Sequence, residues 1–89
     1  DLALSVQTLQ KEGVRVYAAH LKGKDDYDRI NYKGPVAFMI GNEGNGLTDA
    51  LAELADAYIK IPMLGSVESL NAAIAATLLT YEAARQRRN

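Results

Sequence analysis

The first residues that could do chemistry stand in the glycine-rich segment 41–46, GNEGNG, where the carboxylate of Glu43 lies among glycines. The segment separates an apolar run from a helix start, and open parallel sheets bind their ligands at such junctions. A carboxylate placed there is partly desolvated and needs backbone N–H donors or a cationic partner. The G-x-x-G-x-G spacing is neither the dinucleotide fingerprint nor the P-loop, so it predicts no phosphate cradle of either type. A tight turn without a ligand is the alternative.

A second polar group follows in segment 61–71, IPMLGSVESLN. Ser66 or Ser69 can cap the next helix, and Asn71 in its first turn can make a plain local hydrogen bond. The same residues stand among apolar side chains, and a curled loop of this composition forms a small-molecule pocket with apolar walls. Both interpretations stay open on these residues alone.

Few other side chains offer catalytic or metal chemistry. The only histidine, His20, has no partner in the nearby sequence, so we expect it to be incidental rather than catalytic. The chain has no cysteine, which excludes disulfides, thiol nucleophiles and cysteine-rich zinc sites, and we predict no metal site. Absence of cysteine is typical of intracellular proteins, and we expect a cytoplasmic one.

The periodicity of apolar residues predicts the elements that position these segments. Apolar residues recur at helical spacing in a stretch ending at Gly13, whereas residues 14–19 alternate as in a strand. Residues 36–40, VAFMI, have no polar face, which favours a central strand covered on both sides of a parallel sheet. In chain order we predict a helix over 1–13, strands over 14–19 and 36–40, a helix over 48–55, a strand over 58–61 and a helix over 69–87.

This order predicts an α/β fold, with helices flanking a parallel sheet. Between the first two strands, residues 20–33 (HLKGKDDYDRINYK) are the most polar part of the chain. We expect a solvated surface loop there. A loop on the substrate side of the sheet is the alternative.

The last predicted helix is apolar on two sides, which is typical of a buried helix. In so small a domain, one side can pack on the sheet and the other on a second subunit. Its terminal arginines, Arg85, Arg87 and Arg88, suit the helix dipole, and an RNA contact is the alternative. One side carries Leu70, Ile74, Leu78 and Tyr81, and the opposite side carries Ala72, Ala73, Ala75, Ala76 and Leu79.

Size and charge limit the function classes. Eighty-nine residues leave room for one core with little stability to spare. Ten Lys and Arg against eleven Asp and Glu give a net charge of −1, so any nucleic-acid contact must be local. No window approaches 18 apolar residues, and we expect no membrane span. The chain starts at Asp1, and we expect it to be part of a longer protein.

The glycine-rich segment and the second polar segment occur together, in order, within residues 36–87. In this combination they resemble the C-terminal half of the SpoU (TrmH-type) RNA 2′-O-ribose methyltransferases of the SPOUT superfamily. Gly41-Asn42-Glu43-Gly44 is similar to the family's second motif, and Ile61-Pro62-Met63 with Ser69-Leu70-Asn71 is similar to its third. Residues 1–19 also fit the segment before the second motif. Residues 1–89 are thus identified as the C-terminal, cofactor-binding and dimerisation portion of a SPOUT domain.

The resemblance implies a C-terminal trefoil knot, a homodimer formed through the last helix, and S-adenosylmethionine as cofactor. It also implies methyl transfer to a ribose 2′-OH of RNA, with rRNA favoured over tRNA. Catalytic-pocket residues carried over from the family are Glu43, Ser69 and Asn71. Cofactor contacts carried over in the same way are Ala19, Gly41, Ile61, Met63, Ser69 and Leu70.

One part of the family pattern is missing from these 89 residues. The family's first motif, an Asn-x-Gly segment followed by an arginine that serves the target hydroxyl, does not occur in the sequence. Methyl transfer needs that hydroxyl aligned and its proton removed. The alternatives are therefore a non-catalytic knotted dimerisation or binding module, and, less favoured, a nucleotide-binding α/β domain of another kind.

Overall fold

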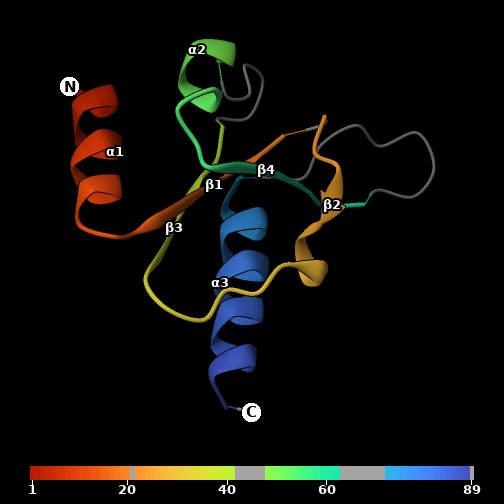
Figure 1. Cartoon of the computed structure of the whole chain (residues 1–89). Helices are drawn as coiled ribbons and strands as arrows, with labels where there is room; N and C mark the ends of the chain where they lie inside the picture. Colours follow the sequence, from red (N-terminus) through yellow and green to blue (C-terminus); the bar gives the residue numbers. More distant parts are fainter. Residues whose placement is uncertain (21, 42–47, 63–71, 89) are drawn as a thin grey trace.

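The computed structural model describes residues 1–20, 22–41, 48–62 and 72–88 (Figure 1). The predicted helices and strands are present in the predicted order, with ends shifted by a few residues. The elements are α1 (Leu2–Lys11), β1 (Arg15–Ala19), β2 (Asp25–Asp26), the 3₁₀ helix η1 (Tyr27–Arg29), β3 (Val36–Met39), α2 (Asp49–Ala52), β4 (Ala57–Lys60) and α3 (Ala72–Arg88).

Local sequence explains several of these boundaries. The Asp1 carboxylate accepts the Ala3 N–H at 2.9 Å and caps α1, and Gly13 ends that segment with a φ of 89°. Thr48 caps α2 by accepting the Leu51 N–H. Helix α2 is shorter than predicted because the next N–H groups, of Leu54 and Ala55, turn to carbonyls three residues back.

The four strands form one parallel sheet in the order β2-β4-β1-β3. Strand β1 is central: Ala18 pairs with Met39 of β3, and Ala19 pairs with Ile59 of β4. The α/β architecture with a parallel sheet is confirmed. The predicted central position of residues 36–40 is wrong for the described strands, since β3 pairs only with β1 and lies at the edge.

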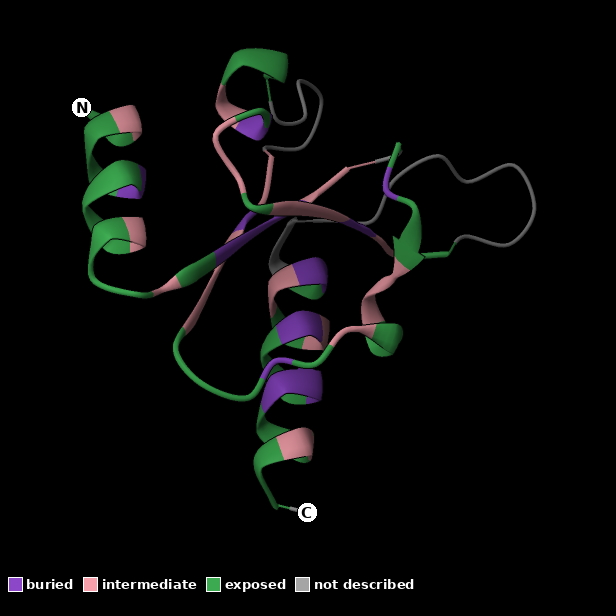
Figure 2. Ribbon diagram, viewed as in Figure 1, coloured by how far each residue is buried: buried purple, intermediate pink, exposed green. Residues whose placement is uncertain are grey.

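Helices lie on both faces of this sheet (Figure 2). Successive residues of β1 point to opposite faces, so they contribute alternately to two cores, one on each face. Val16 and Ala18 face α1 and α2, whereas Tyr17 and Ala19 face α3. The first core consists of Val6, Val16, Ala18, Met39 and Ala52. The second consists of Tyr17, Tyr32, Ile59, Leu79 and Ala83.

The prediction of a solvated loop over residues 20–33 is wrong in part. The segment contains β2 and η1, and Tyr32 within it is fully buried. The Tyr32 ring meets Tyr17 and Phe38 edge-on, each at 5.3 Å between centroids, and its hydroxyl donates to the Tyr27 carbonyl. Burial raises the pKa of this hydroxyl. Because the residues around Tyr32 in the sequence are polar, the sequence did not indicate that its ring is buried in the second core, which lies on the α3 side of the sheet and is called the α3-side core below.

Helix α3 holds this segment in place through its last turns. The Gln86 side chain accepts the Tyr32 N–H at 2.7 Å and donates to the Ile30 carbonyl at 2.7 Å. Arg87 donates to the Gly34 carbonyl. The connection between β1 and β3 is thus fastened to the C-terminal end of α3.

The two sides of α3 differ in burial. Ala75, Leu79 and Ala83 are buried against the sheet, in agreement with the prediction that one side of this helix packs there. Ile74 is 56 % exposed and Tyr81 60 % exposed on the outer side. No helix in the described part of the chain is long and apolar enough to cross a membrane.

Asp56 joins the start of β1 to the two elements beside it. Its carboxylate accepts the Val16 N–H at 2.7 Å and the Gln10 side-chain amide at 3.3 Å. Gln10 also donates to the Leu54 carbonyl at 2.7 Å. One side chain therefore links α1, β1 and the approach to β4.

Replacement of this carboxylate should destabilise the fold. Asp56→Ala leaves the Val16 N–H without its acceptor, and we expect a loss of about 1–2 kcal/mol in the free energy of unfolding. Urea denaturation followed by circular dichroism measures it. Glu53→Ala, a change of an exposed acid three residues earlier, is the control. Equal unfolding free energies for the two variants would contradict this role of Asp56.

Glu82 should make stability depend on pH. Its side chain, in a residue only 7 % exposed, is bound by Arg85 at 2.7 and 2.9 Å and by Gln86 at 3.0 Å. The Arg85 hydrogen bonds, then that of Gln86, lower the Glu82 pKa from 4.5 to about 2. A pKa lowered by folding adds stability above the unfolded value, and this stability is lost as pH falls toward the folded value.

We therefore expect the urea midpoint to fall between pH 4.5 and about 2, and to fall less in Glu82→Gln than in the wild type. The matched control is Glu12→Gln, at an exposed glutamate after α1. A Glu82→Gln variant with the pH dependence of the wild type would show that this carboxylate is not the source.

Candidate functional site

Three of the predicted cofactor residues meet at the carboxyl edge of the sheet. Ala19 ends β1, Gly41 follows the end of β3, and Ile61 follows the end of β4. These strands are neighbours in the order β4-β1-β3, and parallel neighbours lie about 4.8 Å apart. All three residues are partly exposed. The topology thus brings together residues that lie far apart in the sequence.

The other predicted site residues lie outside the described residues. They are Glu43, Met63, Ser69, Leu70 and Asn71. Glu43 follows Gly41 by two positions in the sequence, and Met63 follows Ile61 by two. Their roles in the pocket therefore stay predictions.

The described edge has the chemistry of an apolar ligand wall. Ala19, Ile61 and Ile40 all pack toward the α3-side core, so the edge presents small and aliphatic side chains there. An adenosine group is held by such walls together with backbone polar groups, and the residues present fit it. Within the described ranges, no cluster of three or more His, Asp or Glu could hold a metal ion.

Gly23 lets the turn after β1 pack closely on β4. A Cβ atom at this position would lie 2.7 Å from the Ile59 carbonyl carbon and 2.9 Å from the Lys60 nitrogen. These contacts are with backbone, which cannot move aside cheaply. The close packing of Gly23 on β4, with its N–H donating to the His20 carbonyl at 3.0 Å, therefore depends on glycine.

His20 has partners that its neighbours in the sequence did not suggest. Its ring stacks on Tyr58 at 4.8 Å, and its Nε2 lies 3.5 Å from an Asp49 carboxylate oxygen. Its Nδ1 accepts the Lys22 N–H at 3.1 Å. His20 follows Ala19 directly, so it stands at the candidate site. Its partners Asp49 and Tyr58 lie on α2 and β4, far from His20 in the sequence, so the residues next to His20 could not predict these contacts.

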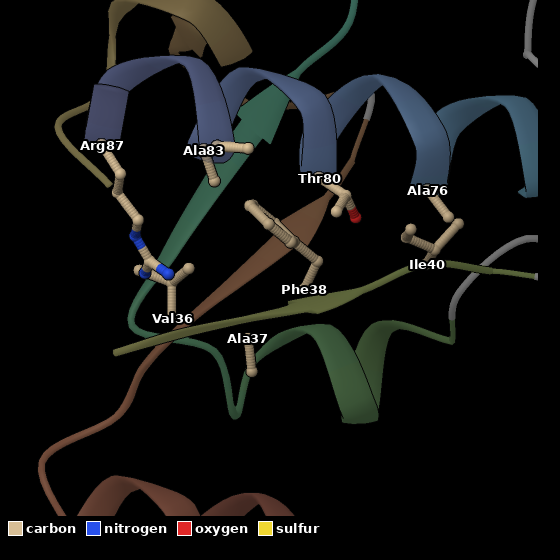
Figure 3. A pocket seen from close by; sticks show the side chains of 9 residues that line it. Val36, Ala37, Phe38, Ile40, Ala76, Thr80, Ala83 and Arg87 are labelled. Atoms are coloured by element: carbon tan, nitrogen blue, oxygen red, sulfur yellow. The ribbon is translucent and has the colours of Figure 1, made fainter. Parts of the chain in front are cut away.

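A groove between β3 and α3 extends from Ile40 at this edge to Val36 and has a volume of about 590 Å³ (Figure 3). Figure 3 shows Phe38 rising between Ala83 and Thr80, with the Arg87 side chain over Val36. The groove is mostly apolar and runs along β3, the outermost strand on that side of the sheet. Its lining residues are Val36, Ala37, Phe38, Ile40, Ala76, Thr80, Ala83, Ala84 and Arg87.

Proteins of similar sequence are RNA methyltransferases by name. The 23S rRNA (guanosine-2′-O-)-methyltransferase RlmB of Ralstonia nicotianae is 40 % identical over 98 % of this chain and 35 % of its own length. The tRNA (guanosine(18)-2′-O)-methyltransferase of Escherichia coli is 41 % identical over 96 % of this chain and 38 % of its own. The chain thus spans about a third of the length of these relatives.

Solved structures agree with the fold. The TrmH/SpoU tRNA modifying enzyme of A. aeolicus superposes with a TM-score of 0.88 at 30 % identity, over 99 % of this chain and 45 % of its own. The SpoU methyltransferase AviRb of Streptomyces viridochromogenes, in complex with the cofactor AdoMet, gives 0.83 at 37 % identity, over 99 % and 34 %. A model of the SpoU rRNA methylase family matches residues 1–81. The chain belongs to the SpoU rRNA methylase family.

Proposed function

We propose that this chain supplies the S-adenosylmethionine pocket of an enzyme that methylates ribose 2′-OH groups of RNA. The observation that carries the proposal is the convergence of Ala19, Gly41 and Ile61 at one edge of the sheet. Family membership supports it, as do relatives named as RNA 2′-O-methyltransferases and a similar structure that holds AdoMet.

Each part of the edge has a role in this proposal. S-adenosylmethionine, when bound, supplies an electrophilic methyl group. Ala19 and Ile61 pack on the apolar part of the cofactor, and the backbone at Gly41 approaches it without a side chain in between. Glu43, Ser69 and Asn71 shape the pocket in which the ribose is aligned. Alignment and exclusion of water are the contributions of this chain.

Removal of the proton from the 2′-OH needs a further group. The family's Asn-x-Gly motif with its arginine is absent from these 89 residues, and the chain spans about a third of its relatives' length. We propose that the remainder of the protein supplies this group. The chain alone then binds the cofactor without methylating RNA.

We propose rRNA, rather than tRNA, as the substrate. The name of the family and the rRNA enzyme of Ralstonia nicotianae support rRNA. The equally similar E. coli enzyme, named for tRNA, makes tRNA the alternative, and the methylation experiment below compares the two. A cytoplasmic location, where both RNAs are present, is part of this proposal.

We also propose a homodimer that forms through α3, and a C-terminal trefoil knot. Ile74 and Tyr81 are more than half exposed on the outer side of α3, where a second subunit would cover them. This exposed side also favours the second candidate function, a dimerisation or binding module without catalysis. Methylation of RNA by the whole protein distinguishes the two.

Titration calorimetry of S-adenosylmethionine into the 89-residue chain tests the pocket. We expect binding, with an affinity about tenfold lower in Ile61→Ala, because that change removes apolar carbons from the pocket wall. Leu4→Ala, at a residue 62 % exposed on α1, is the control and should bind like the wild type. A wild-type chain that is folded but binds no cofactor would contradict the proposed pocket.

Methylation by the whole protein tests the catalytic residues. Glu43→Gln and Asn71→Ala should each lower the rate of 2′-O-methylation by about tenfold or more, since both disturb alignment of the ribose. Incorporation of labelled methyl groups into rRNA and tRNA from cells lacking the enzyme gives both the rate and the substrate. Unchanged turnover in both variants would overturn the site assignment, and methylation of tRNA alone would overturn the rRNA proposal.

A further inference from the structure

His20 stands at the carboxyl edge and contacts two other elements, α2 and β4. Its backbone N–H donates to the Ile59 carbonyl of β4 at 3.0 Å, and its ring stacks on Tyr58 with an interplanar angle of 21°. Its side chain is 15 % exposed. The imidazole is therefore held between the end of β1 and β4 rather than extended into solvent.

The two ring nitrogens have different partners, and these fix the position of the proton. A backbone N–H can only donate, so the Lys22 N–H at 3.1 Å requires an unprotonated Nδ1. The ring proton is then on Nε2, which lies 3.5 Å from the Asp49 carboxylate. Both ring nitrogens therefore face groups of the protein itself, Nδ1 the Lys22 N–H and Nε2 the Asp49 carboxylate. The role of the imidazole is therefore to connect two elements of the fold.

This link reaches the element that follows the glycine-rich segment. Asp49 is the first residue of α2, and α2 begins shortly after residues 42–47, which include Glu43. On its other side His20 adjoins Ala19, the last residue of β1. The imidazole thus connects α2 to the end of β1, where Ala19 contributes to the proposed cofactor pocket.

We propose that His20 is a positioning residue for the cofactor pocket, and that it acts by holding α2 against the end of β1 through Asp49. The inference rests on the proposed function for its cofactor, and on the geometry of His20, Tyr58 and Asp49 for its mechanism. Asp49 is 83 % exposed, so the contact of its carboxylate with the Nε2–H is weak on its own, and stacking and the Lys22 bond hold the ring in place for it.

The test uses variants that separate the link from the turn. In His20→Asn the amide oxygen can still accept the Lys22 N–H, as asparagine does in an Asx-turn, but stacking on Tyr58 and contact with Asp49 are lost. Asp49→Asn removes the charge from the other end. Glu53→Gln, an exposed acid just after α2, is the matched control.

Calorimetry with S-adenosylmethionine and amide hydrogen exchange of the cofactor-free chain are the two measurements. We expect His20→Asn and Asp49→Asn each to weaken cofactor binding about three- to fivefold, and the double variant to lose no more than the larger single loss. Exchange should quicken at the Ala52 and Glu53 amides, which bond to Thr48 and Asp49 carbonyls. The control should match the wild type in both.

The outcomes separate this inference from the proposed function. Binding by the wild type with unchanged affinity and unchanged exchange in His20→Asn would overturn the positioning role and leave the cofactor pocket standing. Additive losses in the double variant would show that His20 and Asp49 act separately, which also overturns it. A wild-type chain that binds no cofactor contradicts the proposed function itself, and the inference falls with it.

Discussion

Hydrogen bonding of β1 on both of its edges is the constraint on which the other described elements depend. Strand β1 pairs with β3 on one side and β4 on the other, so its five residues are fixed in register with two other strands. Alternation along β1 then assigns each helix to a face: α1 and α2 pack over Val16 and Ala18, and α3 packs over Tyr17. The same register aligns the ends of three strands, which creates the candidate site.

Two parts of the chain, α3 and the connection between β1 and β3, cover the same face of the sheet. The described part of the connection from β1 to β3 contains no α-helix, and its Tyr32 is buried in the same core as Leu79 and Ala83 of α3. Gln86 of α3 bonds to main-chain groups on both sides of Asn31. The connection between β1 and β3 thus shares one core with β1, β4 and α3.

Periodicity in the sequence was enough to predict the three α-helices, the strands β1, β3 and β4 and the parallel sheet, because apolar spacing reports on faces that are buried. It did not predict β2 or η1, which lie in a polar segment. It could not predict that β3 lies at the edge, since an apolar strand with both faces covered has the same pattern at either position. The burial of Tyr32 was not predicted, because the residues near it in the sequence include many charged ones. In the site, Ala19, Gly41 and Ile61 followed from the family resemblance, whereas the partners of His20 depend on tertiary contacts from α2 and β4.

The outer edge of β3 has a further consequence for how this chain behaves in solution. Among the described strands nothing pairs with that edge, and its residues Val36, Phe38 and Ile40 are half-buried and uncharged. Such an edge is a template to which another extended chain can add by backbone hydrogen bonds. Backbone pairing at this edge of β3 would be separate from the proposed dimer contact, which buries the outer side of α3.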